Sequence, residues 1–358
     1  MEVGGTLYGM TGSGGRTSTG TLFSVDPTTG TERVLYTFTG RSDGAFPRGD
    51  LNVGGVLYGT TTEGGLFHGT WSYGTVFAYD IAAGKYTVVH DFNGNDGMFP
   101  IAGLIQVGEN LYGTTQEGGR FGHCPYGCGT VFAISPTTQL LTTLHQFKSG
   151  LGGTDPAADM IKVGHRLYGT AQDGKGFHAG SIFSVNLRTG HEKTVHEFYG
   201  IEGPVQPYGG LLNVDGVLYG ASDHGGGYDC DNGGRGCGTI YTVDPKTGAI
   251  NVVYVFTGFS DGAWPRSSLI NVGGILYGTT SFGGSCADNP YAGCGTVFAF
   301  DPKSGTKTTI YTFQGGKDGA RPRGTLLNVS GVLYGTTEEG GGSANCYPGC
   351  GTVFAITP

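Results

Sequence analysis

Charged side chains are scarce in this chain. Only 13% of its 358 residues are charged, and the 20 lysines and arginines are scattered without a basic cluster. The net charge is −8. Proteins that bind nucleic acid gather Lys and Arg to neutralise phosphates, so we expect no nucleic-acid partner.

Long apolar runs are also missing. No stretch reaches the roughly eighteen apolar residues that a transmembrane helix requires. The start, MEVGG, has neither the basic region nor the apolar core of a signal peptide. The chain is therefore either intracellular or a mature or trimmed form of an exported protein. No segment keeps a 3.6-residue apolar period, so we expect almost no helix.

Glycine and aromatic residues are abundant instead. The chain has 73 glycines, 20 tyrosines and 20 phenylalanines. The glycines stand between short β-branched and aromatic runs such as GVLYGTT and TVFAFDP. This pattern is typical of turns between short strands and predicts an all-β protein.

Two motifs recur seven times in the same order. The tripeptide Leu-Tyr-Gly returns every 50–58 residues or so, and a Gly-[Thr/Ser]-apolar-aromatic run follows each copy. The tyrosines of the tripeptide are Tyr8, Tyr58, Tyr112, Tyr168, Tyr219, Tyr277 and Tyr334. Each unit reads as four short strands, with a loop of the form DGAxP between units, as at 43–47, 261–265 and 318–322.

Four antiparallel strands per repeat predict a seven-bladed β-propeller of four-stranded antiparallel blades, a single domain over 1–358. An open solenoid is the competing architecture, although its repeats are usually shorter. The first repeat has only MEV as its first strand, and the last stops at AITP without a fourth. One blade should therefore be incomplete or closed by both termini.

The repeat pattern resembles that of the GloVer family of bacterial tandem-repeat proteins. The motifs GVLYGTT, GCGTVFA and DGAxP occur in the family's order over essentially the whole chain. The fourth repeat departs from the pattern, with GTAQDGKG and no cysteine. The resemblance implies a propeller-like fold and export, often with sorting or anchoring signals. It supplies no catalytic residue.

The eight cysteines form four pairs, each within one loop between the second and third strands. The pairs are Cys124 with Cys128, Cys230 with Cys237, Cys286 with Cys294, and Cys346 with Cys350. Zinc requires four ligands, and the unequal spacings do not suit a shared site, so we favour disulfides over a metal site or reduced thiols. Disulfides persist in oxidising compartments, so we expect an extracellular or cell-surface protein.

The long loops between the second and third strands share a face with the DGAxP connections, because the strands of a blade alternate in direction. These loops differ between repeats and carry aromatic and polar side chains suited to sugar rings. We expect ligand contacts from Trp71, Tyr73, Phe121, Tyr126, Asp173, Asp223, Tyr228, Tyr291, Glu338 and Tyr347. The alternative is that these residues pack under their own loops or cap their turns.

Catalytic residues are not defined by any motif of the sequence. If the protein is an enzyme, the candidates are the loop histidines and acids His68, His123, His178, His224, Glu63 and Glu117. His90, His145 and His196 occupy fourth-strand positions where other repeats have Tyr, so we interpret them as packing residues. The segment DCDNGG at 229–234 has only part of a calcium-ligand set, and we expect no metal or cofactor.

These observations favour a secreted or cell-surface scaffold that binds a glycan or a protein as a monomer. The alternative is a polysaccharide lyase or glycoside hydrolase with its site at the loop-rich mouth of the channel. A purely structural spacer would have uniform loops, and these are not uniform.

Overall fold

The computed structural model describes residues 1–66, 72–120, 124–148, 153–173, 179–200, 202–227, 230, 234–286, 293–342 and 349–358, apart from the side chains of residues 50 and 173. The chain divides into two compact units. Unit 1 comprises Met1–Gly169 and Phe183–Lys193, and unit 2 comprises Thr170–Ile182 and Thr194–Pro358.

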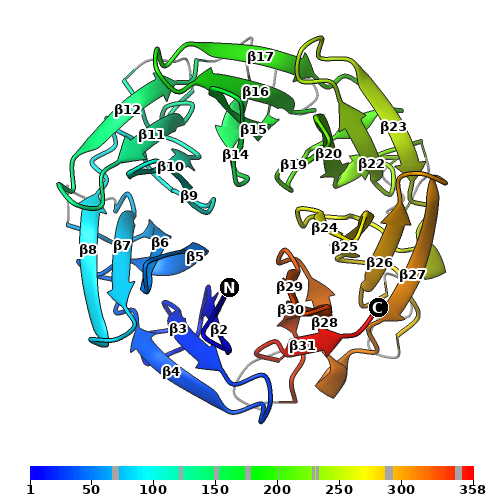
Figure 1. Ribbon diagram of the computed structural model, residues 1–358, viewed down its shortest axis with the longest axis horizontal. Coiled ribbons are helices and arrows are strands. Elements are labelled where there is room, and N and C mark those ends of the chain that lie inside the picture. Colours follow the sequence, from blue (N-terminus) through cyan, green and yellow to red (C-terminus); the bar gives the residue numbers. More distant parts are fainter. Residues whose placement is uncertain are drawn as a thin grey trace. The chain divides into compact units, whose positions relative to one another are not determined.

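Unit 1 contains three complete four-stranded antiparallel sheets, seen side by side in Figure 1. The first consists of β1 (Glu2–Val3), β2 (Thr6–Thr11), β3 (Thr21–Val25) and β4 (Glu32–Thr37). The second consists of β5 (Ala45–Val53), β6 (Val56–Glu63), β7 (Thr75–Asp80) and β8 (Lys85–Asp91). The third consists of β9 (Ile105–Val107), β10 (Asn110–Thr115), β11 (Thr130–Ile134) and β12 (Leu141–Gln146).

The fourth repeat forms a five-stranded sheet. Its strands are β13 (Thr154–Pro156), β14 (Ile161–Val163), β15 (Arg166–Asp173), β16 (Ser181–Asn186) and β17 (Glu192–Glu197). Strand β14 pairs antiparallel with β15, with Ile161 opposite Tyr168. The fourth repeat, one of three without cysteines, thus adds β13 to the four strands of the repeat pattern.

Unit 2 contains the next two complete sheets. One has the order β19 (Leu212–Val214), β20 (Val217–Ser222), β22 (Thr239–Val243) and β23 (Ile250–Val255), beside a short pair of β18 (Pro204–Val205) and β21 (His224–Gly225). The other has β24 (Ile270–Val272), β25 (Ile275–Thr280), β26 (Thr296–Asp301) and β27 (Thr306–Thr312). The 3₁₀ turns η1 (Phe259–Asp261) and η2 (Gly316–Asp318) are the helical segments of the described ranges.

The seventh sheet is the incomplete one. It contains β28 (Ala320–Pro322), β29 (Leu327–Val329), β30 (Val332–Glu339) and β31 (Val353–Ile356). Strand β31 is the counterpart of the third strand in other sheets, and β28 comes from the connection before β29. Seven such antiparallel sheets of one repeat each are a seven-bladed β-propeller, as the repeats predict.

The Leu-Tyr-Gly motif is explained by the pairing of second and third strands. In the second sheet Gly59 lies opposite Phe77, whose ring covers the glycine so closely that a Cβ would lie 2.6 Å from it. The same contact recurs between Gly278 and Phe298 at 2.7 Å. These rings are fully buried, and burying each contributes about 1.5–3 kcal/mol.

A second recurring contact ties each repeat to the next. The glycine that precedes the third strand has a left-handed φ, and the proline of the following DGAxP connection packs against it. At Gly238 an added Cβ would lie 2.5 Å from Ser222 O and 2.6 Å from Pro265 Cδ. The corresponding pairs are Gly20 with Pro47, Gly74 with Pro100, Gly129 with Pro156, Gly180 with Pro207 and Gly295 with Pro322.

Three of the predicted disulfides are present. They join Cys124 to Cys128, Cys230 to Cys237 and Cys286 to Cys294, each within a single loop. Cys350 is also disulfide-bonded, and its predicted partner Cys346 lies outside the described residues. Within the described ranges no helix has the length and apolar character needed to cross a membrane.

Candidate functional site

The residue before the proline of each inter-repeat connection has an unusual backbone conformation. All six such residues have φ between 54° and 60°, the left-handed region that favours glycine. They are Phe46, Phe99, Asp155, Gln206, Trp264 and Arg321. A residue before proline normally takes an extended conformation, so each connection holds its residue against the local preference.

Backbone hydrogen bonds to the neighbouring repeats hold this conformation. The N–H of Phe99 donates to Tyr73 O at 3.0 Å, and the Phe99 carbonyl accepts from Gln116 N–H. The other N–H bonds run from Phe46 to Thr19, Asp155 to Cys128, Gln206 to Ala179, Trp264 to Cys237 and Arg321 to Cys294. The backbone is thus the same in six repeats while the side chain differs in nearly all, which is how a fixed scaffold presents a variable surface.

Unit 1 has a cavity of about 390 Å³ beside one of these residues. Its lining residues are Tyr73, Asn93, Gly94, Asn95, Met98, Phe99, Glu117 and Tyr126. Three of them, Tyr73, Glu117 and Tyr126, are residues that the sequence singles out in two different loops. The volume lies within the range of about 300–1,000 Å³ that is usual for small-molecule sites.

The two tyrosines of the cavity are attached to firmly held backbone. Tyr126 lies inside the Cys124–Cys128 disulfide loop, and its carbonyl accepts from Gly118 N–H at 2.9 Å, while its side chain is 60% exposed. The Tyr73 ring packs against Gly94, where a Cβ would lie 3.5 Å from the ring. Both tyrosines thus line the cavity from segments whose carbonyls are hydrogen-bonded, Tyr73 O to Phe99 N–H and Tyr126 O to Gly118 N–H.

Glu117 has the least usual environment of the lining residues. Its backbone pairs with Met98 in both directions, at 2.9 and 3.1 Å, which fixes it just beyond the end of β10. Its Oε2 is buried and has no hydrogen-bond partner among the described residues. Burial raises the pKa of this carboxyl above its ordinary value. A hydrogen-bond donor from water or from a bound ligand would satisfy this acceptor.

A second polar cluster lies in unit 2 around Asp223. This carboxylate is 1% exposed and accepts from Arg266 twice, at 2.8 and 3.1 Å. His224 Nδ1 lies 2.9 Å from Asp223 Oδ2, at ion-pair distance but without hydrogen-bond geometry. Burial alone would raise the pKa of Asp223, but the contacts with His224 and Arg266 outweigh it and hold the pKa below its ordinary value.

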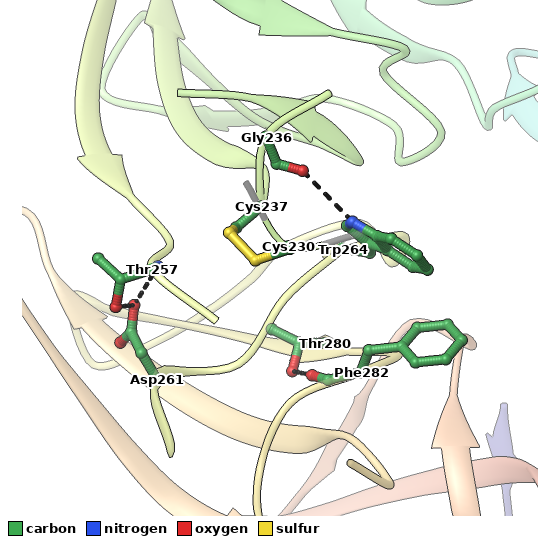
Figure 2. Close-up of a disulfide and its surroundings, with 8 residues drawn as sticks. All are labelled: Cys230, Gly236, Cys237, Thr257, Asp261, Trp264, Thr280 and Phe282. Atoms are coloured by element: carbon green, nitrogen blue, oxygen red, sulfur yellow. Dashed lines mark hydrogen bonds between the residues drawn. A yellow bond between two sulfur atoms is a disulfide. The ribbon is translucent and has the colours of Figure 1, made fainter. Parts of the chain in front are cut away.

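Aromatic rings extend this cluster. His224 stacks on Trp264 with centroids 5.5 Å apart, and Trp264 meets Phe282 edge to face at 4.5 Å. Figure 2 shows Trp264 and Phe282 side by side, with the Trp264 indole N–H donating to Gly236 O next to the Cys230–Cys237 disulfide. Arg321 lies over the Phe282 ring at 5.0 Å. The predicted residues Asp223 and His224 therefore belong to a packed network.

The remaining predicted site residues are placed as follows. Glu63 ends β6 and is exposed. Glu338 is half-exposed and pairs with Arg323 at 3.0 Å. Asp173 ends β15, and its side chain is not among those described. His68, Trp71, Phe121, His123, His178, Tyr228, Tyr291 and Tyr347 lie outside the described residues.

The fourth-strand histidines are packing residues, as the exchange with Tyr indicates. His90, His145 and His196 meet the rings of Phe92, Phe147 and Phe198 at 4.8–5.1 Å. Burial lowers the pKa of His145 to about 4, so this ring is neutral at pH 7. The described residues contain no group of three His, Cys, Asp or Glu side chains that could hold a metal.

The pre-proline residues were missed by sequence reasoning. Trp264 in the Asp223 cluster occupies the variable position of DGAxP, and Phe99 in the cavity occupies the same position of the related segment DGMFP at 96–100. A repeated motif with one varying, often aromatic position was the available signal. What the sequence does not reveal is the left-handed conformation that brings these side chains beside the loops.

The fold and these loop-borne clusters define a β-propeller built from tandem repeats. The sequence profile of the Gloeobacter/Verrucomicrobia repeat matches residues 1–233 and 206–358, which together cover the whole chain. The protein belongs to this repeat family. No match to a curated protein was found.

Solved structures with the same fold have varied functions. An oligogalacturonate lyase from Vibrio parahaemolyticus is 12% identical, with a TM-score of 0.56 over 99% of this chain and 87% of that one. An oligogalacturonate lyase in complex with manganese is 14% identical, with a TM-score of 0.55 over 99% and 86%. A chain of a nidogen/laminin complex is 14% identical, with a TM-score of 0.52 over 89% and 97%. At these identities the likeness is one of fold alone.

Proposed function

We propose that this protein is an extracellular or cell-surface binding scaffold that recognises a glycan through its long loops. In this proposal residues 1–358 form one propeller domain that acts as a monomer. The cavity lined by Tyr73, Phe99, Glu117 and Tyr126 is a ligand site. The single observation that carries the proposal is the convergence of these residues from separate loops on one cavity.

The chemistry of the cavity suits a sugar. The faces of Tyr73, Phe99 and Tyr126 offer apolar surface for the C–H side of a pyranose ring, and the Glu117 carboxyl and the Asn95 amide offer polar groups for its substituents. Large aromatic side chains are enriched at binding surfaces. A cavity lined by three of them therefore favours a ligand site over a hollow that holds only solvent.

The compartment is argued from the cysteines. The disulfides of three loops, with the bonded Cys350 in a fourth, would be reduced in most cytosols. An oxidising, extracellular setting therefore supports a role in binding material outside the cell.

The experiment is a glycan array with product analysis on the full chain. We expect a bound glycan that is released unchanged, and a Tyr126→Ala variant should lose affinity by roughly tenfold or more because it removes an exposed stacking ring. Tyr199→Ala is the matched control, since Tyr199 is 66% exposed and lies outside the cavity lining. Equal loss in both variants, or no binding by the wild type, would contradict the proposal.

The alternative function is a polysaccharide lyase or glycoside hydrolase. Its best catalytic arrangement among the described residues is His224 beside Asp223, but both are buried, and Arg266 occupies the carboxylate. The Glu117 cavity has one carboxyl and no histidine in its lining. Cleaved product in the array experiment would favour the enzyme over the scaffold.

A further inference from the structure

The carboxyl group of Glu117 indicates what kind of ligand the cavity accepts. Buried carboxylates in proteins are normally paired with a cation or with several hydrogen-bond donors, because desolvation of an unpaired charge is costly. Glu117 is half-buried, its Oε2 is buried without a hydrogen-bond partner in the described part of the chain, and burial raises the pKa of its carboxyl. An ammonium group of a ligand would supply the missing partner.

The other lining residues cannot supply a positive charge. The lining consists of Tyr73, Phe99, Tyr126, Met98 and Gly94 with two asparagines, and it includes no Lys, Arg or His. One asparagine is already engaged, since the Asn93 amide donates to Asp96 at 2.7 Å and its oxygen accepts from Asn95 N–H at 3.0 Å. Little remains in the cavity to satisfy the carboxyl or to recognise a neutral polyhydroxyl compound by itself.

The aromatic rings of the cavity also favour a positively charged ligand. The faces of Tyr and Phe carry negative potential and attract ammonium groups, most strongly where water is excluded. A carboxyl together with three rings therefore forms a site for a cation. An anionic sugar would be repelled here, and the net charge of −8 opposes it as well.

We propose that the cavity binds an amino sugar, with the ammonium group of a 2-amino-2-deoxyhexose paired to Glu117 and its ring against Tyr73, Phe99 and Tyr126. This inference rests on the proposed function, because it names the sugar class for the same site. Acetylation of the amine removes its charge and with it the pairing to the carboxyl. The site therefore distinguishes a deacetylated glycan from its acetylated form.

The test is calorimetric titration of the full chain at pH 6.5 with tetramers of glucosamine, N-acetylglucosamine and glucose. We expect the glucosamine tetramer to bind about tenfold more tightly than either neutral tetramer. In Glu117→Gln that preference should disappear, while weak binding of all three tetramers remains. This variant keeps the shape of the side chain and should be about as stable as the wild type, because it replaces a half-buried carboxyl whose Oε2 has no hydrogen-bond partner among the described residues.

Each alternative outcome is decisive. Equal affinity for the three tetramers, absence of glucosamine binding, or a preference that survives Glu117→Gln would overturn the inference. Tighter binding of Nα-acetyl-lysine amide, whose side-chain ammonium is free, than of the glucosamine tetramer would overturn the sugar assignment. Tyr126→Ala separates the two proposals: if it weakens neutral tetramers while Glu117→Gln has no effect, the glycan scaffold stands and the amino-sugar inference fails.

Discussion

Individual glycines and prolines determine how one repeat meets the next. Gly238 has a left-handed φ of 97° and lies against Pro265 of the following connection. Any larger residue would have to displace both the proline ring and the Ser222 carbonyl. The recurring Gly-Thr and DGAxP motifs are thus two halves of one contact.

The first prediction compares two glycines with positive φ. Gly238→Ala should lower the free energy of unfolding by roughly 1–3 kcal/mol more than Gly216→Ala, because only the former overpacks a junction. Gly216 has φ 89° and no atom within 4 Å of an added Cβ, so its variant reports the backbone strain alone. Urea unfolding measures both, and equal losses would show that the junction is not tightly packed.

The second prediction concerns the buried pair of Asp223 and Arg266. Arg266→Ala leaves the buried Asp223 carboxylate without its guanidinium partner and with only His224 beside it, and should cost about 3–5 kcal/mol at pH 7. Arg323→Ala is the control, because the Arg323–Glu338 pair is 40% and 47% exposed and should be worth less than about 1 kcal/mol. Urea unfolding of both variants checks the difference.

The pH dependence of this pair has a definite sign. The pKa of Asp223 is lowered in the folded protein, so its stabilising effect is complete above the ordinary Asp value of 3.8 and is lost as the pH falls through the folded value. Without Arg266 the Asp223 carboxyl is harder to ionise. Its protonation removes the buried negative charge and so reduces the destabilisation of the variant. The difference between wild type and Arg266→Ala should therefore shrink below about pH 4. A difference that stays constant from pH 7 to pH 3 would contradict this assignment.

At the scale of elements, the pre-proline turn is the feature that joins structure to binding. Glycine would adopt the left-handed conformation without strain, and this chain uses glycine freely. All six connections nevertheless keep a side chain there, at a cost of about 1–2 kcal/mol each. Retained strain of this kind is expected where the side chain makes a needed contact.

The third prediction uses two of these turns. Phe99→Gly should leave stability nearly unchanged, because relief of strain offsets lost apolar contact, and should weaken glycan binding because one wall of the cavity is gone. Phe46→Gly makes the same change one repeat earlier, outside the cavity lining, and should leave binding intact. Titration of both variants with the array-selected glycan checks this, and equal binding in the two would remove Phe99 from the site.

Loop residues show where sequence reasoning stops. Tyr73, Glu117 and Tyr126 could be selected because they are aromatic or acidic residues in long variable loops. Their meeting in one cavity depends on the pairing of Glu117 with Met98 and on the bond from Phe99 to Tyr73, which join different repeats. Such pairings between repeats cannot be predicted from the spacing of the motifs within one repeat. For Asp223 the same reasoning could not foresee that Arg266 engages the carboxylate.

At the scale of the molecule, the repeat itself made the fold predictable. Seven copies of two motifs predict the number of blades, and the β-branched and aromatic runs between glycine turns predict their strands. The incomplete seventh blade was also visible, since no fourth-strand pattern follows residues 353–356. The left-handed turns and the ion pairs were not, because they depend on contacts between repeats rather than on local pattern.

The fourth prediction addresses the proposed single domain. The six junctions between Gly20–Pro47 and Gly295–Pro322 are built in the same way, so none should open much before the others. We expect one calorimetric unfolding transition with equal calorimetric and van't Hoff enthalpies. Two separate transitions would indicate that the two compact units unfold independently.

The uniform pre-proline turns make the protein a suitable scaffold for engineering new binding specificities. The six pre-proline positions share one backbone conformation, and phenylalanine, aspartate, glutamine, tryptophan or arginine occupies them in this chain. A library randomised at these six positions alone would alter the side chains presented there while the glycines and prolines of the junctions kept their sequence. New specificities within this repeat family could evolve in the same way, by substitution of one pre-proline residue at a time.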